Sequence, residues 1–248
     1  MSDISGPGSG EGAVRPKAGS GRSLRIAVVL LVAASGALES VSFLGLDRVF
    51  AGVMTSNLAF LGMAVGRGET VGVTAAVLAL AGFGAGALIV ALHTRGCAAA
   101  TTHWPPRILM VLGAEAVLLA AGALVWGLTG GRPNAAIRDV MQCGAALAMG
   151  AQSAAMVAAG QAAAPTTYLT GTLATYIVKG VGTGHPGVWV PLRLAGLMVG
   201  AAISAALLAE ARPWAALPPV VLMLGAIAIA CEPIRARRRD PVGRNRSA

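Results

Sequence analysis

Glu39 is the side chain with the clearest capacity for chemistry, because it stands about fifteen residues into a long apolar run, 24–46. An acidic group deep in a bilayer costs on the order of 2.5–3.5 kcal/mol on insertion scales, so it is usually functional or paired. Ser35 and Ser42 stand four residues before and three after it and share its helix face. This face is a candidate proton or cation site. The alternative is a protonated carboxyl that hydrogen-bonds a neighbouring helix.

Two shorter runs, near 50–65 and 166–180, carry further candidate site residues. They hold the hydroxyl and amide side chains Thr55, Ser56, Asn57, Thr170 and Thr172. A helix that breaks inside a membrane frees backbone groups that can bind an ion or substrate, and such side chains can complete the coordination. Alternatively, they only form hydrogen bonds between helices.

The remaining reactive side chains predict no enzyme, metal site or cofactor. Glu115 stands alone on an Ala/Leu/Val-rich segment, where a neutral acid bonded to a backbone carbonyl or packing partner is the favoured interpretation. The cysteines and histidines are scattered, without a CxxC spacing or a recognisable nucleophile–base arrangement: Cys97, Cys143, Cys231, His93, His103 and His185.

The elements that must position these residues are membrane helices. The 248 residues are 56% apolar and 12% charged, with mean hydropathy +0.73, whereas soluble domains are about 25% charged. Six runs approach the length that a helix needs to cross a bilayer: 24–46, 70–92, 107–128, 137–160, 189–209 and 214–231. The sequence therefore predicts an all-α integral membrane bundle of six long spans and two short helices.

The net charge of +9 is concentrated before the first apolar run and after the last. This distribution follows the positive-inside rule and predicts a membrane protein with both termini cytoplasmic. The tails lack the interleaved aromatics of a nucleic-acid surface, so no nucleic-acid partner is predicted. Residues 1–22 should form a disordered basic tail and residues 233–248 a second basic tail, the latter able to lie against anionic lipid.

Recurring landmarks predict an internal duplication, with one repeat over 23–128 and a second over 137–232. Gly36-Ala37 recurs as Gly150-Ala151, and Ala81-Gly82 with Gly86-Ala87 recurs as Ala195-Gly196 with Gly200-Ala201, each 114 positions later. The Gly82/Gly86, Gly196/Gly200 and Gly62/Gly66 pairs are expected to form flat faces for close helix packing.

The number of crossings stays open at this point. If each short helix enters and leaves on one side, the repeats have three spans and opposite orientations, as in many secondary transporters. If each short helix crosses, the repeats are parallel and the total is eight. Both arrangements put the two termini on the same side of the membrane.

Several of these segments together resemble a known family. They are Gly36-Ala37-Leu38-Glu39-Ser40-Val41-Ser42-Phe43, Met54-Thr55-Ser56-Asn57 with Leu61-Gly62, Gly150-Ala151-Gln152-Ser153-Ala154, and Thr167-Tyr168-Leu169-Thr170-Gly171-Thr172-Leu173. Over about residues 24–232 the chain is similar to the bacterial YoaK-type membrane proteins of unknown function. The resemblance implies an inner-membrane protein and supplies no activity. Ser153, a further candidate site residue, stands where the family pattern has Asn, as Glu39 stands where it has Asp and Ser56 where it has Gly.

Two functional hypotheses follow. The first is a small-solute transporter or permease, with the bilayer, a small solute and a proton as candidate partners. The second is a non-transporting scaffold or lipid-contact protein, which the basic C-terminal tail and the lack of a complete coordination set favour.

Overall fold

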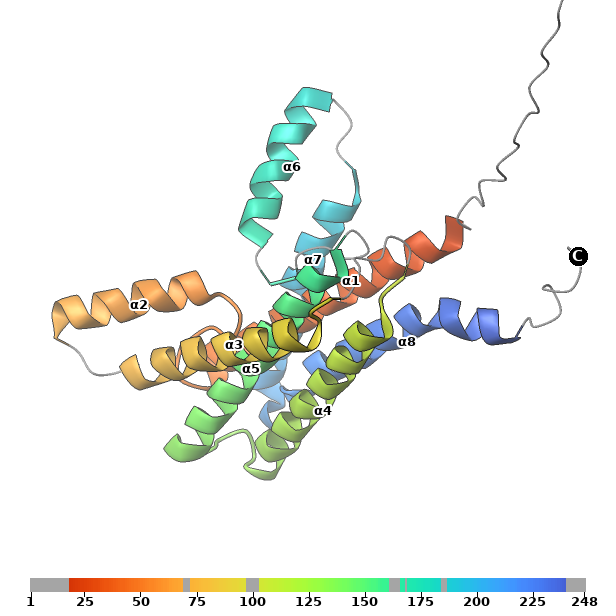
Figure 1. The fold of residues 1–248 in the computed structure, drawn as a ribbon. Coiled ribbons are helices and arrows are strands. Elements are labelled where there is room, and N and C mark those ends of the chain that lie inside the picture. Colours follow the sequence, from red (N-terminus) through yellow and green to blue (C-terminus); the bar gives the residue numbers. More distant parts are fainter. Residues whose placement is uncertain are drawn as a thin grey trace, which may run out of the picture.

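The computed structural model describes residues 18–68, 72–96, 103–160, 166–167, 169–183 and 187–239, and this part of the chain is built from helices. The six long helices are α1 (Ala18–Ser40), α3 (Val73–His93), α4 (Pro106–Leu128), α5 (Ala135–Ala159), α7 (Trp189–Glu210) and α8 (Leu217–Arg239). Helix α1 continues through a π-helical turn at Val41–Gly45. Two short helices are α2 (Met54–Arg67) and α6 (Leu169–Thr183), and a 3₁₀ turn covers Arg212–Trp214. Figure 1 shows their arrangement.

All six predicted spans are confirmed as helices long and apolar enough to cross a bilayer. Local signals fix several of their ends. Pro106 stands in the first turn of α4, Asn134 Oδ1 accepts the Ile137 N–H at 3.0 Å to cap α5, and Gly68 ends α2 at φ 68°. Large apolar side chains such as Val117 and Val140 remain exposed on the outer surface, as expected for helices that face lipid.

Two tails are more helical than the sequence indicated. Helix α1 begins at Ala18, so residues 18–22 are helical where a disordered tail was predicted. Helix α8 continues to Arg239, into the predicted basic tail 233–248. Long apolar helices that follow or precede these segments allow the hydrogen-bonded ladder to extend into them. Residues 1–17 and 240–248 lie outside the described residues.

Helices α1 and α5 are the most buried of the six and each packs on a parallel partner. Gly200 and Gly196 of α7 lie against the backbone of Ala33 and Val29 in α1. A Cβ atom at Gly200 would overlap the Ala33 carbonyl, so glycine is required for this approach. The predicted packing role of the Gly196/Gly200 pair is thus confirmed.

The same contacts occur between α3 and α5. Gly82 and Gly86 of α3 lie against the carbonyls of Cys143 and Leu147 in α5. The two sets of contacts are related by a shift of 114 positions. Gly82 and Gly86 stand 114 positions before Gly196 and Gly200, and Cys143 and Leu147 stand 114 positions after Val29 and Ala33. The duplication itself stays a prediction. The Gly62/Gly66 prediction is wrong, because a Cβ atom at either position would meet nothing within 4 Å.

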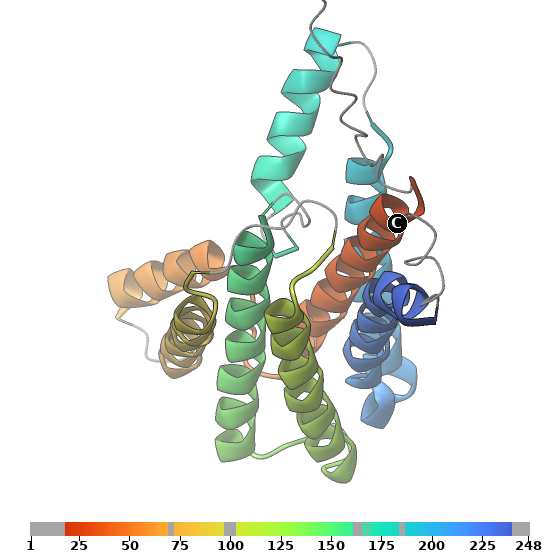
Figure 2. The same cartoon turned by 45° about the vertical axis from the view of Figure 1, so that its right-hand side comes forward.

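The long helices alternate in direction along the chain. Ser42, at the end of α1, hydrogen-bonds Gln142 near the start of α5, and Trp126, at the end of α4, hydrogen-bonds Arg212 between α7 and α8. Helices α1, α4 and α7 therefore end where α3, α5 and α8 begin, and we call this the distal end. The start of α1 and the last turns of α8 lie together at the opposite, proximal end (Figures 1 and 2).

This alternation is the one expected if the six long helices each cross the membrane once. Since α1 and α3 run in opposite directions, α2 must begin and finish on the distal side of the bundle. By the same reasoning α6, between α5 and α7, belongs to the proximal side. The two short helices lie at the outside of the bundle. Helix α2 packs along α3, whereas α6 has only slight contact with α7 (Figure 2).

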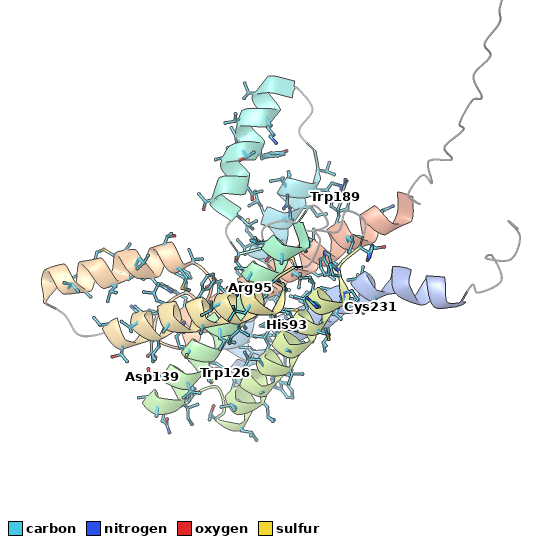
Figure 3. The ribbon with its side chains drawn as sticks, in the orientation of Figure 1. His93, Arg95, Trp126, Asp139, Trp189 and Cys231 are labelled. Atoms are coloured by element: carbon cyan, nitrogen blue, oxygen red, sulfur yellow. The ribbon has the colours of Figure 1, made fainter. Side chains whose placement is uncertain are left out.

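Each end of the bundle carries an arginine stacked on a tryptophan. The Arg25 guanidinium lies 5.4 Å from the Trp189 ring centre at the proximal end, and Arg212 lies 5.6 Å from Trp126 at the distal end. Figure 3 shows the two tryptophans toward opposite ends. Tryptophan is enriched at both interfaces of a membrane, and one of these pairs stands at each end of the bundle.

Candidate functional site

The most irregular backbone of the bundle lies between α1 and α2. At Val41–Gly45 α1 widens into a π-helical turn, a feature frequent at functional sites. Arg48 then adopts a left-handed conformation, φ 58°, and the chain turns back along the bundle. Val49, Ala51 and Gly52 in this returning segment are buried. The non-helical backbone at residues 49–52 is therefore held inside the protein, whereas Arg48 is exposed.

Glu39 satisfies two backbone amides of this segment. Its Oε2 accepts the Ala51 N–H at 2.8 Å and its Oε1 accepts the Gly52 N–H at 2.7 Å. Away from water, each of these amides would otherwise lack a partner at a cost of several kcal/mol. A Cβ atom at Gly52 would lie 2.9 Å from Glu39 Oε1, so the close approach needs glycine. The carboxyl predicted as a site residue therefore anchors the returning segment.

Three further polar side chains complete what we call the Glu39 cluster: Ser42, Asn57 and Gln142. The Ser42 hydroxyl lies 2.6 Å from the Val49 carbonyl oxygen and 2.8 Å from Gln142 Oε1, and can donate to one of them at a time. Asn57 accepts the Phe50 N–H at 3.0 Å and donates to the Phe50 carbonyl at 2.7 Å. All three side chains are fully buried.

The cluster sits well inside the bundle. Glu39 precedes the end of the π-helical turn by six residues, about 9 Å at 1.5 Å per residue. Gly52 lies against Met149, near the middle of α5. Helix α2 thus begins below the distal surface, with its first turn tied to the cluster through Asn57.

A second, smaller cluster lies at the other end of α5. Gln152 Nε2 donates to Thr166 Oγ1 at 2.8 Å, and the hydroxyls of Ser153 and Thr167 are 2.5 Å apart. These bonds tie α5 to the chain that leads into α6, as the Glu39 cluster ties α1 to the chain that leads into α2. Residues 161–165 and Tyr168 lie outside the described residues.

The structure brings together some of the predicted site residues and not others. Glu39, Ser42 and Asn57 meet in one cluster, and Ser153 belongs to the second. Ser35 is buried one turn from Glu39 and takes no part in those hydrogen bonds. Thr55, Ser56, Thr170 and Thr172 lie on the outlying helices α2 and α6, with Thr55 and Thr170 exposed.

Sequence reasoning missed Gln142 and Gln152, which are both fully buried. The available signal was an uncharged amide inside the apolar run 137–160, where a polar side chain must find a partner. Neither amide has a sequence neighbour that reveals that partner.

Glu115 is buried, 3% exposed, on α4, and both its carboxyl oxygens lack a hydrogen-bond partner among the described residues. The expected backbone or packing partner is thus not seen in that part of the chain.

At the distal surface, Arg138 Nε lies 3.1 Å from Asp47 Oδ1. The part of the chain that the structure describes has no group of three His, Cys, Asp or Glu side chains placed to hold a metal ion. Cys97 and His185 lie outside it.

Comparison with known proteins adds two matches. The profile of a family described as "Protein of unknown function (DUF1275)" matches residues 27–230. Over 148 residues the chain is 32% identical to the UPF0700 transmembrane protein YoaK of Bacillus subtilis (strain 168). That alignment covers 60% of this chain and 63% of the relative. No solved structure matches.

Proposed function

We propose a transport function for this chain, which belongs to the DUF1275 family of proteins of unknown function. It is a multi-pass membrane protein with six apolar helices and a transmembrane relative. The observation that carries the proposal is the non-helical backbone of residues 49–52, which the Glu39 cluster fixes inside the bundle. Within a membrane, such backbone occurs where it is buried in protein or lines a path for water or solute. We propose a small-solute transporter or permease.

The two short helices supply the elements that could move. Helix α2 lies on the distal side and α6 on the proximal side. The segment that leads into α2 is hydrogen-bonded to α1, and the segment that leads into α6 is hydrogen-bonded to α5. Elements with few packing contacts are the ones that open at low free energy. Opening one cluster while the other stays closed would expose a central site to one side at a time, as alternating access requires.

Glu39 is the ionisable member of its cluster and makes a proton the candidate coupling ion. As a carboxylate it accepts both the Ala51 and Gly52 amides. When protonated, one of its oxygens carries a hydrogen and becomes a donor, so one amide loses its acceptor. Protonation would in this way loosen the returning segment.

The proposed orientation is an inner-membrane protein with the proximal end in the cytoplasm. The proximal end carries the start of α1 and the end of α8, beyond which lie the arginine-rich ends of the sequence. The positive-inside rule favours the cytoplasm for that end.

The experiment is uptake into proteoliposomes that hold the purified protein. Radiolabelled amino acids, organic acids and sugars serve as solutes, and a trapped pH-sensitive dye reports proton movement. We expect the wild type to move a solute or protons above empty liposomes, and Glu39→Gln to lower that flux at least tenfold. Glu115→Gln is the matched control, because Glu115 is also a buried membrane carboxyl but lies outside the cluster, and its flux should be unchanged.

Two results would count against the proposal. If no solute and no proton flux exceeds the empty-liposome rate, the transport function is wrong. If flux is present and equal in the wild type and Glu39→Gln, transport does not depend on this cluster.

A further inference from the structure

A cavity of about 600 Å³ lies between α1, α4, α5 and α8 near the distal end. Its walls come from the last turns of α1 and α4 and the first turns of α5 and α8, including Leu38, Leu119, Gly144 and Ala216. All of its lining side chains are apolar except Ser42, whose hydroxyl is already committed to the Glu39 cluster. The size is that of a ligand site, about 300–1,000 Å³, but the walls offer an occupant no polar contact.

The cavity opens sideways, onto the surface of the bundle that faces the bilayer. Val140 of α5 lines it and is 73% exposed, and Val125 of α4 lines it at 36%. An occupant would therefore enter from the hydrocarbon and not from water. This favours an apolar chain as occupant.

Three arginines stand on the elements that form the distal end, or rim, of the cavity. Arg138 precedes the lining residues Met141 and Ala145 by three and seven positions, which places it on the same face of α5. Arg132 is exposed in the turn that joins the two helices forming the walls, α4 and α5. Arg212, just before the lining residue Ala216, donates from Nε to the Gly131 carbonyl at 2.8 Å in the same turn.

The acidic groups near this rim do not balance the arginines. Asp47 meets the Nε of Arg138 at 3.1 Å, and Asp139 is turned roughly a quarter-turn further around α5. The guanidinium group of Arg138 carries further N–H donors, and its side chain is 38% exposed. The rim therefore presents positive charge at the depth where lipid head groups lie.

We propose that this cavity binds one acyl chain of an anionic phospholipid, with the phosphate held at the rim by Arg132 and Arg138. The apolar walls match the chain and the guanidinium groups match the phosphate, which they bind through charge-assisted hydrogen bonds. Basic pockets between membrane helices bind anionic head groups in this way. The proposal stands on the cavity and its rim and is independent of any transport.

The test compares thermal unfolding of the full chain in a neutral detergent with added phosphatidylglycerol, phosphatidylcholine of the same acyl chains, or inorganic phosphate. Phosphatidylglycerol at 100-fold its Kd should raise the Tm by about 5–10 °C. Phosphatidylcholine should give less than half that shift and phosphate alone none, because only the anionic lipid supplies both the chain and the charge.

Three variants locate the site. Gly144→Phe and Gly122→Phe should fill the cavity and abolish the phosphatidylglycerol shift; Cβ space is open at both, with Leu118 at 3.9 Å the nearest neighbour of Gly144. Arg132→Gln should reduce the shift to that of phosphatidylcholine. Gly113→Phe is the matched control, since Gly113 on α4 also has open Cβ space but does not line the cavity.

Equal shifts with the two lipids in the wild type would overturn the head-group part of the proposal. A full phosphatidylglycerol shift in Gly122→Phe would place the lipid elsewhere and overturn the cavity. If Gly144→Phe does not fold, Gly122→Phe and Arg132→Gln decide the outcome.

Discussion

At the scale of single residues, the polar side chains in the bundle divide into those with partners and those without. Glu39, Ser42, Asn57 and Gln142 hydrogen-bond the backbone of residues 49–52, and Ser42 also hydrogen-bonds Gln142. Glu115 has no such bond among the described residues. The same residue type, on two long apolar helices of one bundle, therefore has two different roles in stability.

Replacing Glu39 with Gln should destabilise the protein by about 1–3 kcal/mol, the cost of one buried polar group left unpaired. A carboxylate accepts from both the Ala51 and Gly52 amides, whereas the Gln amide has a single acceptor oxygen. Unfolding in SDS, followed by circular dichroism, measures the change, and Glu115→Gln serves as the control with a change under about 0.5 kcal/mol. Equal losses in both variants would show that the two backbone hydrogen bonds do not matter.

At the scale of helices, the bundle is held by pairs that approach through glycine. Gly86 and Gly200 each stand where a Cβ atom would overlap a carbonyl of the partner helix. Van der Waals packing drives association between membrane helices, since lipid offers them no hydrophobic gain. The glycine faces therefore decide which helices become neighbours.

Gly86→Ala should cost about 1–3 kcal/mol of stability, because α3 must move away from the Leu147 carbonyl of α5 to make room for the methyl group. Gly84→Ala, on the same helix with open space around its Cβ position, should be neutral. The two variants can be compared by thermal unfolding in detergent. The packing argument fails if Gly86→Ala unfolds at the same temperature as Gly84→Ala.

At the scale of the whole molecule, the alternation of the six long helices determines on which side each loop lies. Arg67, at the end of α2, belongs to the distal side, and Arg95, just after α3, belongs to the proximal side with both termini. Figure 3 shows Arg95 apart from Trp126 and Asp139, which lie toward the distal end.

Single cysteines at these two positions should label from opposite sides of the membrane. In a background with Cys97, Cys143 and Cys231 replaced by Ala, a membrane-impermeant thiol reagent should label Arg67→Cys in intact cells and Arg95→Cys only after the cells are opened. The reverse pattern, with Arg95→Cys labelled in intact cells and Arg67→Cys protected, would contradict this arrangement and is the result expected of the eight-span alternative.

The six spans could be predicted because their signal is local: length and apolarity alone define a membrane helix. That Glu39 needs a partner could also be anticipated, since a charge in the membrane is costly, but its partners, the Ala51 and Gly52 amides, could not. The partners of Gln142 and Gln152 could not be recognised, because they come from other parts of the chain and tertiary packing alone brings them together. The prediction that Gly62 and Gly66 form a packing face was wrong for a related reason: a pattern of small residues does not specify a partner helix.

The pairing of α1 with α7 also has a consequence for biosynthesis. The Ser40 hydroxyl of α1 donates to the Ala201 carbonyl of α7 at 2.9 Å, across 161 residues of chain. A ribosome that adds about 5–20 residues per second needs roughly 8–30 s to make that stretch. During this interval the face of α1 that later packs on the glycines of α7 is uncovered. Helix α1 thus waits for its final packing partner and depends on lipid or on the insertion machinery until then.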